Sequence, residues 1–135
     1  MTDPILALQA PLVAALRADA ELQALLGEAI FDAPPIGQAP PYVVIARHDV
    51  VPRDSDLAPG HEHRLLLHVI AREPSRQAAL AVVERVLAVA LGAALDGSLL
   101  AVTHRRHERT ETVIDPVGGR ARAAVAIRMY SEPAT

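Results

Sequence analysis

The sequence predicts an α+β fold in which helices pack on one face of a mainly antiparallel sheet. Residues 61–72 alternate in character with a period of two, as in a strand, and residues 76–95 carry apolar side chains at helical spacing. Two more strand-like stretches follow this helix. The order helix, strand, strand, helix, strand, strand is typical of helices covering one side of an antiparallel sheet. A chain of 135 residues is expected to form one domain, residues 1–135.

The first helix is predicted to begin at Pro4. Asp3 has a side chain that suits the N-cap, and proline is favoured at the first helical position. Pro11 removes one helical hydrogen bond, so we expect a kink or a new helix start there. Asp19 can cap a second, short helix over residues 20–26.

A short strand, a rigid connection and a longer strand are expected next. Ile30 and Phe31 can form the short strand, and residues 32–41 hold four prolines, which keep an extended connection out of any sheet. Residues 42–47 are rich in β-branched side chains and predict a strand. Residues 49–60 are polar and broken by proline, which indicates a long hairpin loop.

The strand that starts at His63 has one core face and one mixed face. Every second side chain from His63 to Ala71 is expected to point into the core. The other face combines charged and aliphatic side chains, so we expect a helix or a second copy of the chain to cover it. The residues of this mixed face include Arg64, Leu66, His68 and Ile70.

The helix over residues 76–95 is predicted to be the longest, at about 30 Å. Ser75 is its expected N-cap, and Asp96-Gly97 is its expected stop. Its second half is apolar or alanine on all sides, which is typical of a helix that is buried on more than one side. The sheet can cover only one side, so a neighbouring element or subunit should cover the other.

Two strands and a hairpin loop are expected after this helix. Residues 99–109 start apolar and then turn polar on both faces, so the far end of that strand is either solvated or in contact with a partner. Residues 110–120 contain a proline and a glycine pair, which indicates a loop. Residues 120–130 alternate again and predict the last strand.

Composition excludes several classes of protein. A net charge of -3 argues against wrapping duplex DNA, and one Phe, two Tyr and no Trp leave few stacking platforms for single strands. The absence of cysteine excludes disulfides, cysteine zinc sites and thiol nucleophiles. The longest apolar run, between Arg85 and Asp96, has about half the length of a bilayer crossing, and the first residues lack a secretion signal. No membrane contact is expected.

The histidines give only a weak metal hypothesis. His61 and His63 lie two residues apart and project to the same side of a strand. His68 falls on the opposite face, and His104 and His107 differ in parity, so three ligands do not converge in regular strands. We expect histidines on solvated strand faces, with no metal and no cofactor.

No catalytic pattern is present in the sequence. It contains no nucleophile elbow, no phosphate-binding glycine loop and no H-E-x-x-H helix. Asp54 and Asp56 are paired, but they belong to a polar loop with nothing to raise their pKa. The sequence therefore predicts a protein that is not an enzyme.

Three arginines, Arg105, Arg106 and Arg109, predict a small basic patch. Surface salt bridges to Glu108 and Glu111 are one interpretation of this patch. The more specific interpretation is that this patch contacts another subunit or a partner protein.

Three stretches carry a resemblance to a known family. Residues 16–27 read L-R-A-D-A-E-L-Q-A-L-L-G, residues 40–45 read P-P-Y-V-V-I, and residues 131–133 read S-E-P. Together with the strand and helix of residues 61–95, they resemble the tail-completion, or tail-terminator, proteins of long-tailed phages and gene transfer agents. The similarity runs across nearly the whole chain. Ile70 departs from it, because the family tends to carry an aromatic residue there.

The resemblance implies a homo-oligomeric ring, typically a hexamer, that caps the tail tube, stops its polymerisation and offers a surface to the head and neck. Such a protein is made in the bacterial cytoplasm and ends in the assembled particle, at the neck end of the tail. Its implied partners are the tail tube protein and a head–tail connector or stopper, while DNA passes through the ring without specific binding. Two alternatives stay open: a head-side connector or stopper, and a small-ligand-binding or enzymatic α+β domain.

Two sets of residues are the candidate sites. Loop contacts to the tube or the neck are expected from Asp49, Arg53, Asp54, Asp56, Val113, Ile114 and Asp115. The subunit interface is expected to include Arg64, Leu66, His68, Ile70, Arg105, Arg106 and Arg109.

Overall fold

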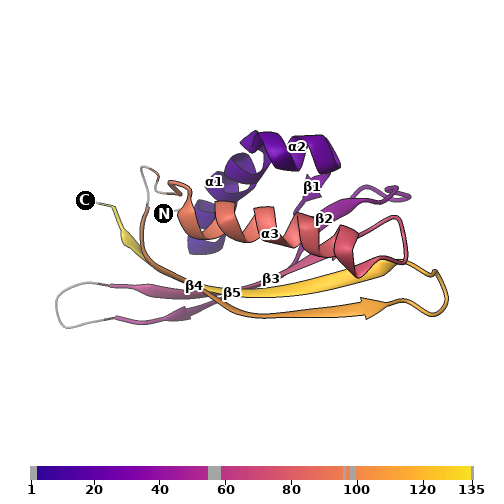
Figure 1. Cartoon of the computed structure of the whole chain (residues 1–135). Coiled ribbons are helices and arrows are strands. Elements are labelled where there is room, and N and C mark those ends of the chain that lie inside the picture. Colours follow the sequence, from indigo (N-terminus) through magenta and orange to yellow (C-terminus); the bar gives the residue numbers. More distant parts are fainter. Residues whose placement is uncertain (1–2, 55–58, 96, 98–99, 135) are drawn as a thin grey trace.

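The computed structural model describes residues 3–54, 59–95, 97 and 100–134, and it confirms the α+β fold. Within these residues, helices lie over one face of a five-stranded sheet with the strand order β1-β2-β3-β5-β4 (Figure 1). Neighbouring strands are antiparallel, except for the short parallel pair β1 and β2. The elements are α1 (Pro4–Ala18), α2 (Ala20–Leu26), β1 (Ile30–Phe31), β2 (Tyr42–Pro52), β3 (His61–Ile70), α3 (Arg76–Gly92), β4 (Leu100–Ile114) and β5 (Ala121–Pro133).

The two N-terminal helices begin where their caps predict. Asp3 accepts a hydrogen bond from the backbone N–H of Ile5 at 2.8 Å, and Asp19 accepts one from the N–H of Leu22 at 3.1 Å. The expected new helix start at Pro11 is wrong, because α1 continues through that residue. One lost hydrogen bond is outweighed there by the buried face of α1, which packs Leu8, Leu12 and Leu16 into the core.

The long helix α3 is covered by the sheet on one side and by helices on another. It packs against β3, β4 and β5, and also against α1 and α2. A neighbouring element of the same chain therefore covers the second apolar side. The expected stop at Asp96-Gly97 is wrong, since α3 ends at Gly92 and Asp96 lies outside the described residues. The extended backbone at Ala93 instead carries Leu95 into the core.

An ion pair connects two of these helices. Arg85 of α3 donates a hydrogen bond to the carboxylate of Asp19 at 2.7 Å. This bond is the main reason why the pKa of Asp19 is lowered from its ordinary value. The residue that caps α2 therefore also attaches α2 to α3.

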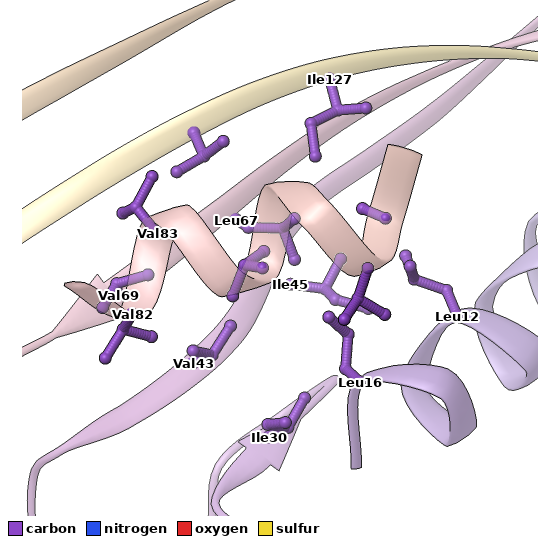
Figure 2. Close-up of a cluster of buried hydrophobic side chains, with 14 of the residues drawn as sticks. Leu12, Leu16, Ile30, Val43, Ile45, Leu67, Val69, Val82, Val83 and Ile127 are labelled. Atoms are coloured by element: carbon purple, nitrogen blue, oxygen red, sulfur yellow. The ribbon is translucent and has the colours of Figure 1, made fainter. Parts of the chain in front are cut away.

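The core lies between the sheet and the helices and is built from aliphatic side chains (Figure 2). Alternate residues of β3 and β5 point into it, as predicted. Burial of such side chains is the main stabilising contribution in a chain with so few aromatic residues. Those labelled in Figure 2 are Leu12, Leu16, Ile30, Val43, Ile45, Leu67, Val69, Val82, Val83 and Ile127.

Two predicted loops are shorter than expected, because their flanking strands are longer. β2 continues to Pro52, which pairs with His61, so Asp49 is a strand residue. Proline is tolerated there because the outer side of β2 has no neighbour at that level among the described residues, so no partner is lost with the missing N–H. β4 continues to Ile114, so Val113 is also in a strand. The connections are therefore residues 53–60 and 115–120.

The described helices include none long and apolar enough to cross a membrane.

Candidate assembly interface

The face of the sheet opposite the helices, called here the helix-free face, brings most of the predicted interface residues together. Cross-strand pairing aligns Arg47, Leu66, Ala126 and Arg109 in one row across four strands. No helix of the described chain covers this face in Figure 1. Of the two covers expected from the sequence, a described helix is therefore absent from this face, and a second copy of the chain stays a prediction.

Two surface hollows lie on the helix-free face. One, of about 190 Å³, is lined by Leu66, His68, Arg109 and Val113 among others. The other, of about 340 Å³, is lined by residues that include Ile70, Val113 and Asp115. Residues predicted as loop contacts, such as Val113 and Asp115, therefore line the same hollows as residues predicted for the subunit interface.

Paired charges cover much of the helix-free face. Pairs with two exposed partners, such as Arg47–Asp49 and Arg109–Glu111, contribute little to stability, but they leave a surface whose charges are locally balanced. The salt-bridge interpretation of the basic patch is therefore correct for Arg109. The pairs are Arg47–Asp49 at 2.6 Å, Arg64–Glu62 at 2.6 Å, Arg109–Glu111 at 3.3 Å and Arg128–Glu108 at 3.1 Å.

The other two arginines of the predicted patch differ from Arg109. Arg105 donates a hydrogen bond to the carbonyl oxygen of Ala90 at 3.1 Å, so its side chain reaches α3. Arg106 is exposed and makes no ion pair with another described residue. Arg106 thus offers an exposed positive charge at the outer strand without an ion pair among the described residues.

A buried carboxylate fixes the end of the β2–β3 hairpin. Glu62 is 2% exposed and lies 3.4 Å from Arg53 and 2.6 Å from Arg64, measured between charged atoms. The hydroxyl of Tyr130 donates a hydrogen bond to Oε1 of Glu62 at 3.2 Å. The hydrogen bond from Arg64 is the largest cause that lowers the pKa of Glu62. Arg53, predicted as a loop contact to the tube or the neck, is therefore partly engaged within the subunit.

The hairpin formed by β2 and β3 and the hairpin formed by β4 and β5 close at opposite ends of the sheet (Figure 1). His61 at the start of β3 pairs with Ser131, whereas Ile70 at its end pairs with Arg122 near the start of β5. The described residues 53–54 and 59–60 therefore lie at one end and residues 115–120 at the other. A single subunit can contact different partners at its two ends.

Carboxylates order the described parts of both connections. Asp54 accepts a hydrogen bond from the N–H of Gly60 at 3.2 Å. Asp115 accepts one from the N–H of Val117 at 2.9 Å, and this bond is the largest cause that lowers the pKa of Asp115. Asp56 lies outside the described residues.

A pair formed by the buried His63 and the half-buried His48 was missed by the sequence analysis, and the expectation of histidines on solvated strand faces is wrong for His63. His63 is fully buried, and its ring nitrogens lie 2.9 Å from Nε2 of His48 and 2.7 Å from Oγ of Ser131. His48 was missed because the strand β2 was ended before it. The alternation of β2, extended past the bulge at Ala46, is the signal that could have placed His48 beside His63.

This polar cluster is structural in character. Ser131 is 2% exposed, so its hydroxyl cannot reach a substrate even though a histidine lies within hydrogen-bonding distance. Among the described residues, no three histidines or carboxylates are placed to hold a metal ion. The cluster instead gives both ring nitrogens of His63 a partner within the core, whereas the buried Nδ1 of His48 has no hydrogen-bond partner among the described residues.

Replacing Gly60 by alanine is expected to destabilise the end of the β2–β3 hairpin. A Cβ at this position would lie 2.7 Å from the carbonyl oxygen of Arg53, so the backbone would have to move. We expect a loss of about 1–3 kcal/mol in the free energy of unfolding, measured by urea denaturation.

The matched control for this prediction is Gly92→Ala at the end of α3, where an added Cβ meets nothing within 4 Å. We expect that control to be neutral or slightly stabilising, because alanine favours a helix. Equal stability of the two variants would contradict the steric argument.

Comparisons with known proteins agree with the resemblance noted in the sequence. The family model described as "Tail completion protein gp17" matches residues 10–132. A chain from a structure titled "Virion of native gene transfer agent (GTA) particle" is 28% identical and superposes with a TM-score of 0.86. That match covers 97% of this chain and 99% of the other. No curated protein matches.

The family match spans most of the chain, from within α1 to the second-last residue of β5. The chain therefore belongs to the tail completion protein family, which is structural and not enzymatic.

Proposed function

We propose that this chain forms a ring, a hexamer by resemblance to its family, that caps the tail tube of a phage-like particle. The ring stops the polymerisation of the tube and provides the surface to which the head or neck attaches. The observation that carries the proposal is the nearly complete match, over 97% of this chain and 99% of the other, to a chain in a gene transfer agent virion. The proposed location is the neck end of the tail in the assembled particle.

The two-ended geometry of the sheet supports this role. A cap must bind the last ring of the tube and present a different surface to the neck, and this chain carries separate connections at its two ends. We assign the partners, the tube protein and a connector or stopper, to these ends. The proposed contacts are Asp49, Arg53, Asp54 and Asp56 near one end, and Val113, Ile114 and Asp115 near the other.

The helix-free face supports a subunit contact within the ring. Leu66 and Ile70 are only half-buried by the chain itself, and they belong to a surface without a helix over it. We propose that neighbouring subunits cover part of this surface. The proposed contact residues are Arg64, Leu66, His68 and Ile70 on the face, with Arg105, Arg106 and Arg109 on β4.

A gold label on a C-terminal tag tests the position of the chain. We expect the label at the junction of head and tail in complete particles. In a strain that cannot join heads to tails, we expect it at one end of the free tubes. A label that stays with the heads would support the head-side connector alternative, and a label at the distal tip would overturn both.

Reversing the charge of Asp54 is expected to impair joining more than folding. Asp54 is exposed, and exposed loop charges usually change stability by less than about 0.5 kcal/mol. We expect Asp54→Arg, alone or with Asp56→Arg, to lower the fraction of joined particles counted by electron microscopy. Asp54→Asn is the control, because it keeps an acceptor for the N–H of Gly60. An Asp54→Arg strain with normal joining would remove this residue from the contact.

A further inference from the structure

A row of hydrogen-bonded side chains crosses three strands on the core side of the sheet. Nε2 of His48 in β2 lies 2.9 Å from Nδ1 of His63 in β3, and Nε2 of His63 lies 2.7 Å from Oγ of Ser131 in β5. These three residues are called here the histidine row. Pro52 pairs with His61, and His61 pairs with Ser131. The histidine row therefore links three strands at the end of the sheet where the β2–β3 hairpin closes.

The unpartnered nitrogen of His48 fixes the direction of these hydrogen bonds. With both rings neutral, only one of the two nitrogens that face each other carries a hydrogen. If Nδ1 of His63 carried it, the hydrogen of His48 would lie on Nδ1, which is buried and has no hydrogen-bond partner among the described residues. A buried N–H without an acceptor is rarer in proteins than a buried acceptor without a donor. His48 therefore donates from Nε2 to His63, and His63 donates from Nε2 to Ser131.

The intact row has no favourable place for another proton. A proton on His63 would set two N–H groups against each other across the 2.9 Å contact with His48. If His48 then moved its own hydrogen to Nδ1, that buried hydrogen would have no acceptor among the described residues. A proton added directly to Nδ1 of His48 meets the same problem and brings a charge as well. Uptake of a proton therefore requires the row to open.

Charged groups from several elements face the two rings. Carboxylates favour a charge on His48, and in decreasing order of effect they are Asp49 in β2, Asp3 before α1 and Asp32 after β1. His48 and His61 disfavour a charge on His63, whereas Asp3 favours it. Burial is the largest cause for both rings and lowers both pKa values, that of His63 to about 4. Both rings are therefore expected to be neutral in the folded chain at pH 7, while an exposed histidine takes up a proton near pH 6.5.

This end of the sheet is held by polar contacts more than by apolar packing. Of the four buried polar or charged side chains among the described residues, three lie here, namely Glu62, His63 and Ser131. In β2, whose residues are all described, none beyond Ile45 is buried. Opening this end therefore exposes little apolar surface, and such local opening costs less free energy than unfolding of the whole chain.

We propose that the histidine row is an acid-sensitive latch, whose protonation opens the end of the β2–β3 hairpin while the core between the sheet and the helices stays folded. The hairpin carries Arg53 and Asp54, two of the proposed contacts, so acid releases that contact surface. The inference goes beyond the proposed function, because the latch belongs to the single chain and does not require a ring.

Glu62 sets the lower limit of the pH range in which the histidine row acts alone. Its carboxylate holds the same hairpin from the other face through Arg53, Arg64 and Tyr130. Its pKa is lowered from 4.5, mainly by the hydrogen bond from Arg64, so this stabilisation is lost only below pH 4.5. The histidines have folded values below 6.5, so their stabilisation is lost as the pH falls from 6.5. The range between pH 6.5 and 4.5 therefore isolates the latch.

Hydrogen exchange of the full chain at pH 7, 6 and 5, corrected for the intrinsic pH dependence of amide exchange, tests the latch. Below pH 6.5 we expect the protection of amides in residues 48–51 and 61–64 to fall by about tenfold per pH unit, because opening then binds one proton. At every pH these amides should be at least about tenfold less protected than those of residues 123–127 in β5, because they exchange by local opening. Equal protection of the two groups would show that the proton enters only on global unfolding and would overturn the latch, as would hairpin protection that does not change with pH.

Nitrogen-15 NMR of the imidazole rings tests the direction of the hydrogen bonds. At pH 7 we expect the hydrogen on Nε2 in both His48 and His63, with both Nδ1 atoms bare. A hydrogen on Nδ1 of either ring would overturn the assigned direction and the latch that depends on it.

His63→Gln removes the buried titrating group and should leave hairpin protection nearly constant between pH 6.5 and 4.5. His61→Gln is the matched control, because the His61 ring is close to His63, with ring centroids 6.5 Å apart, but takes no part in the hydrogen bonds of the row. We expect this control to keep the pH dependence of the native chain. The same dependence in His63→Gln, shown to be folded by circular dichroism, would contradict the latch, and the exchange of the native chain decides if that variant does not fold.

Discussion

A strain that lacks this chain is expected to produce DNA-filled heads without attached tails, beside free tubes of irregular or excessive length. A tube that grows by adding identical rings presents the same surface after every addition. Its growth ends in a controlled way only when a subunit binds that surface and exposes a different one. In the proposed role, the two ends of the sheet, one at Pro52 and His61 and the other at residues 115–120, supply these two surfaces. Negative-stain electron microscopy of lysates measures both the joining and the distribution of tube lengths.

Expression of the native chain from a plasmid is the control and should restore joined particles with one tail length. The head-side alternative predicts a different result, namely tubes of normal length beside heads that lose their DNA. Joined particles of normal tail length in the deletion strain would contradict both roles. The distribution of tube lengths is the more informative measurement, because many defects block the joining of heads and tails but few make the tube length irregular.

The central part of the fold could be predicted because its burial is one-sided. β3 and β5 each bury one face, so their apolar residues recur with a period of two. The caps at Asp3, Asp19 and Ser75 are local, since each needs only its own side chain and an N–H two or three residues later. Such signals do not depend on the rest of the chain.

The ends of the edge strands could not be predicted in the same way. The second half of β4 is polar because it is largely exposed at the edge of the described sheet, and polarity resembles a loop signal. Thr110 and Thr112 are β-branched, which is the signal that could have extended this strand. In β2 the bulge after Ile45 shifts the alternation of inward and outward side chains. The sequence pattern therefore does not indicate that the strand continues to Pro52.

The family could be identified from the sequence, whereas the contact surfaces depend on the fold. Membership in the tail completion family confirms the resemblance carried by residues 16–27, 40–45 and 131–133. Register across four strands is needed to see that Leu66 and Arg109 share one face. It is also needed to see that Arg105 reaches α3 while Arg106 does not. The roles of these residues in assembly stay predictions.

Acidification from pH 7 to pH 4 is expected to reduce the free energy of unfolding by about 3 kcal/mol through His63 alone. Burial is the main cause that lowers the pKa of His63 from 6.5 to about 4, and His48 and His61 add to it. Because the folded value lies below the unfolded one, the unfolded chain binds the proton more tightly in this range. The stabilisation is complete above pH 6.5 and is lost as the pH falls towards 4.

Urea denaturation at pH 7, 6, 5 and 4 measures this loss, and His63→Gln should flatten the part of the curve between pH 6.5 and 4.5. Glu62 and Asp19 also have lowered pKa values, but their stabilisation is present above the unfolded values of 4.5 and 3.8 and is lost only below them. His68→Gln is the matched control, because burial also lowers the pKa of His68, although that residue is only half-buried. Equal slopes for the native chain and His63→Gln between pH 6.5 and 4.5 would show that His63 does not take up the proton on unfolding.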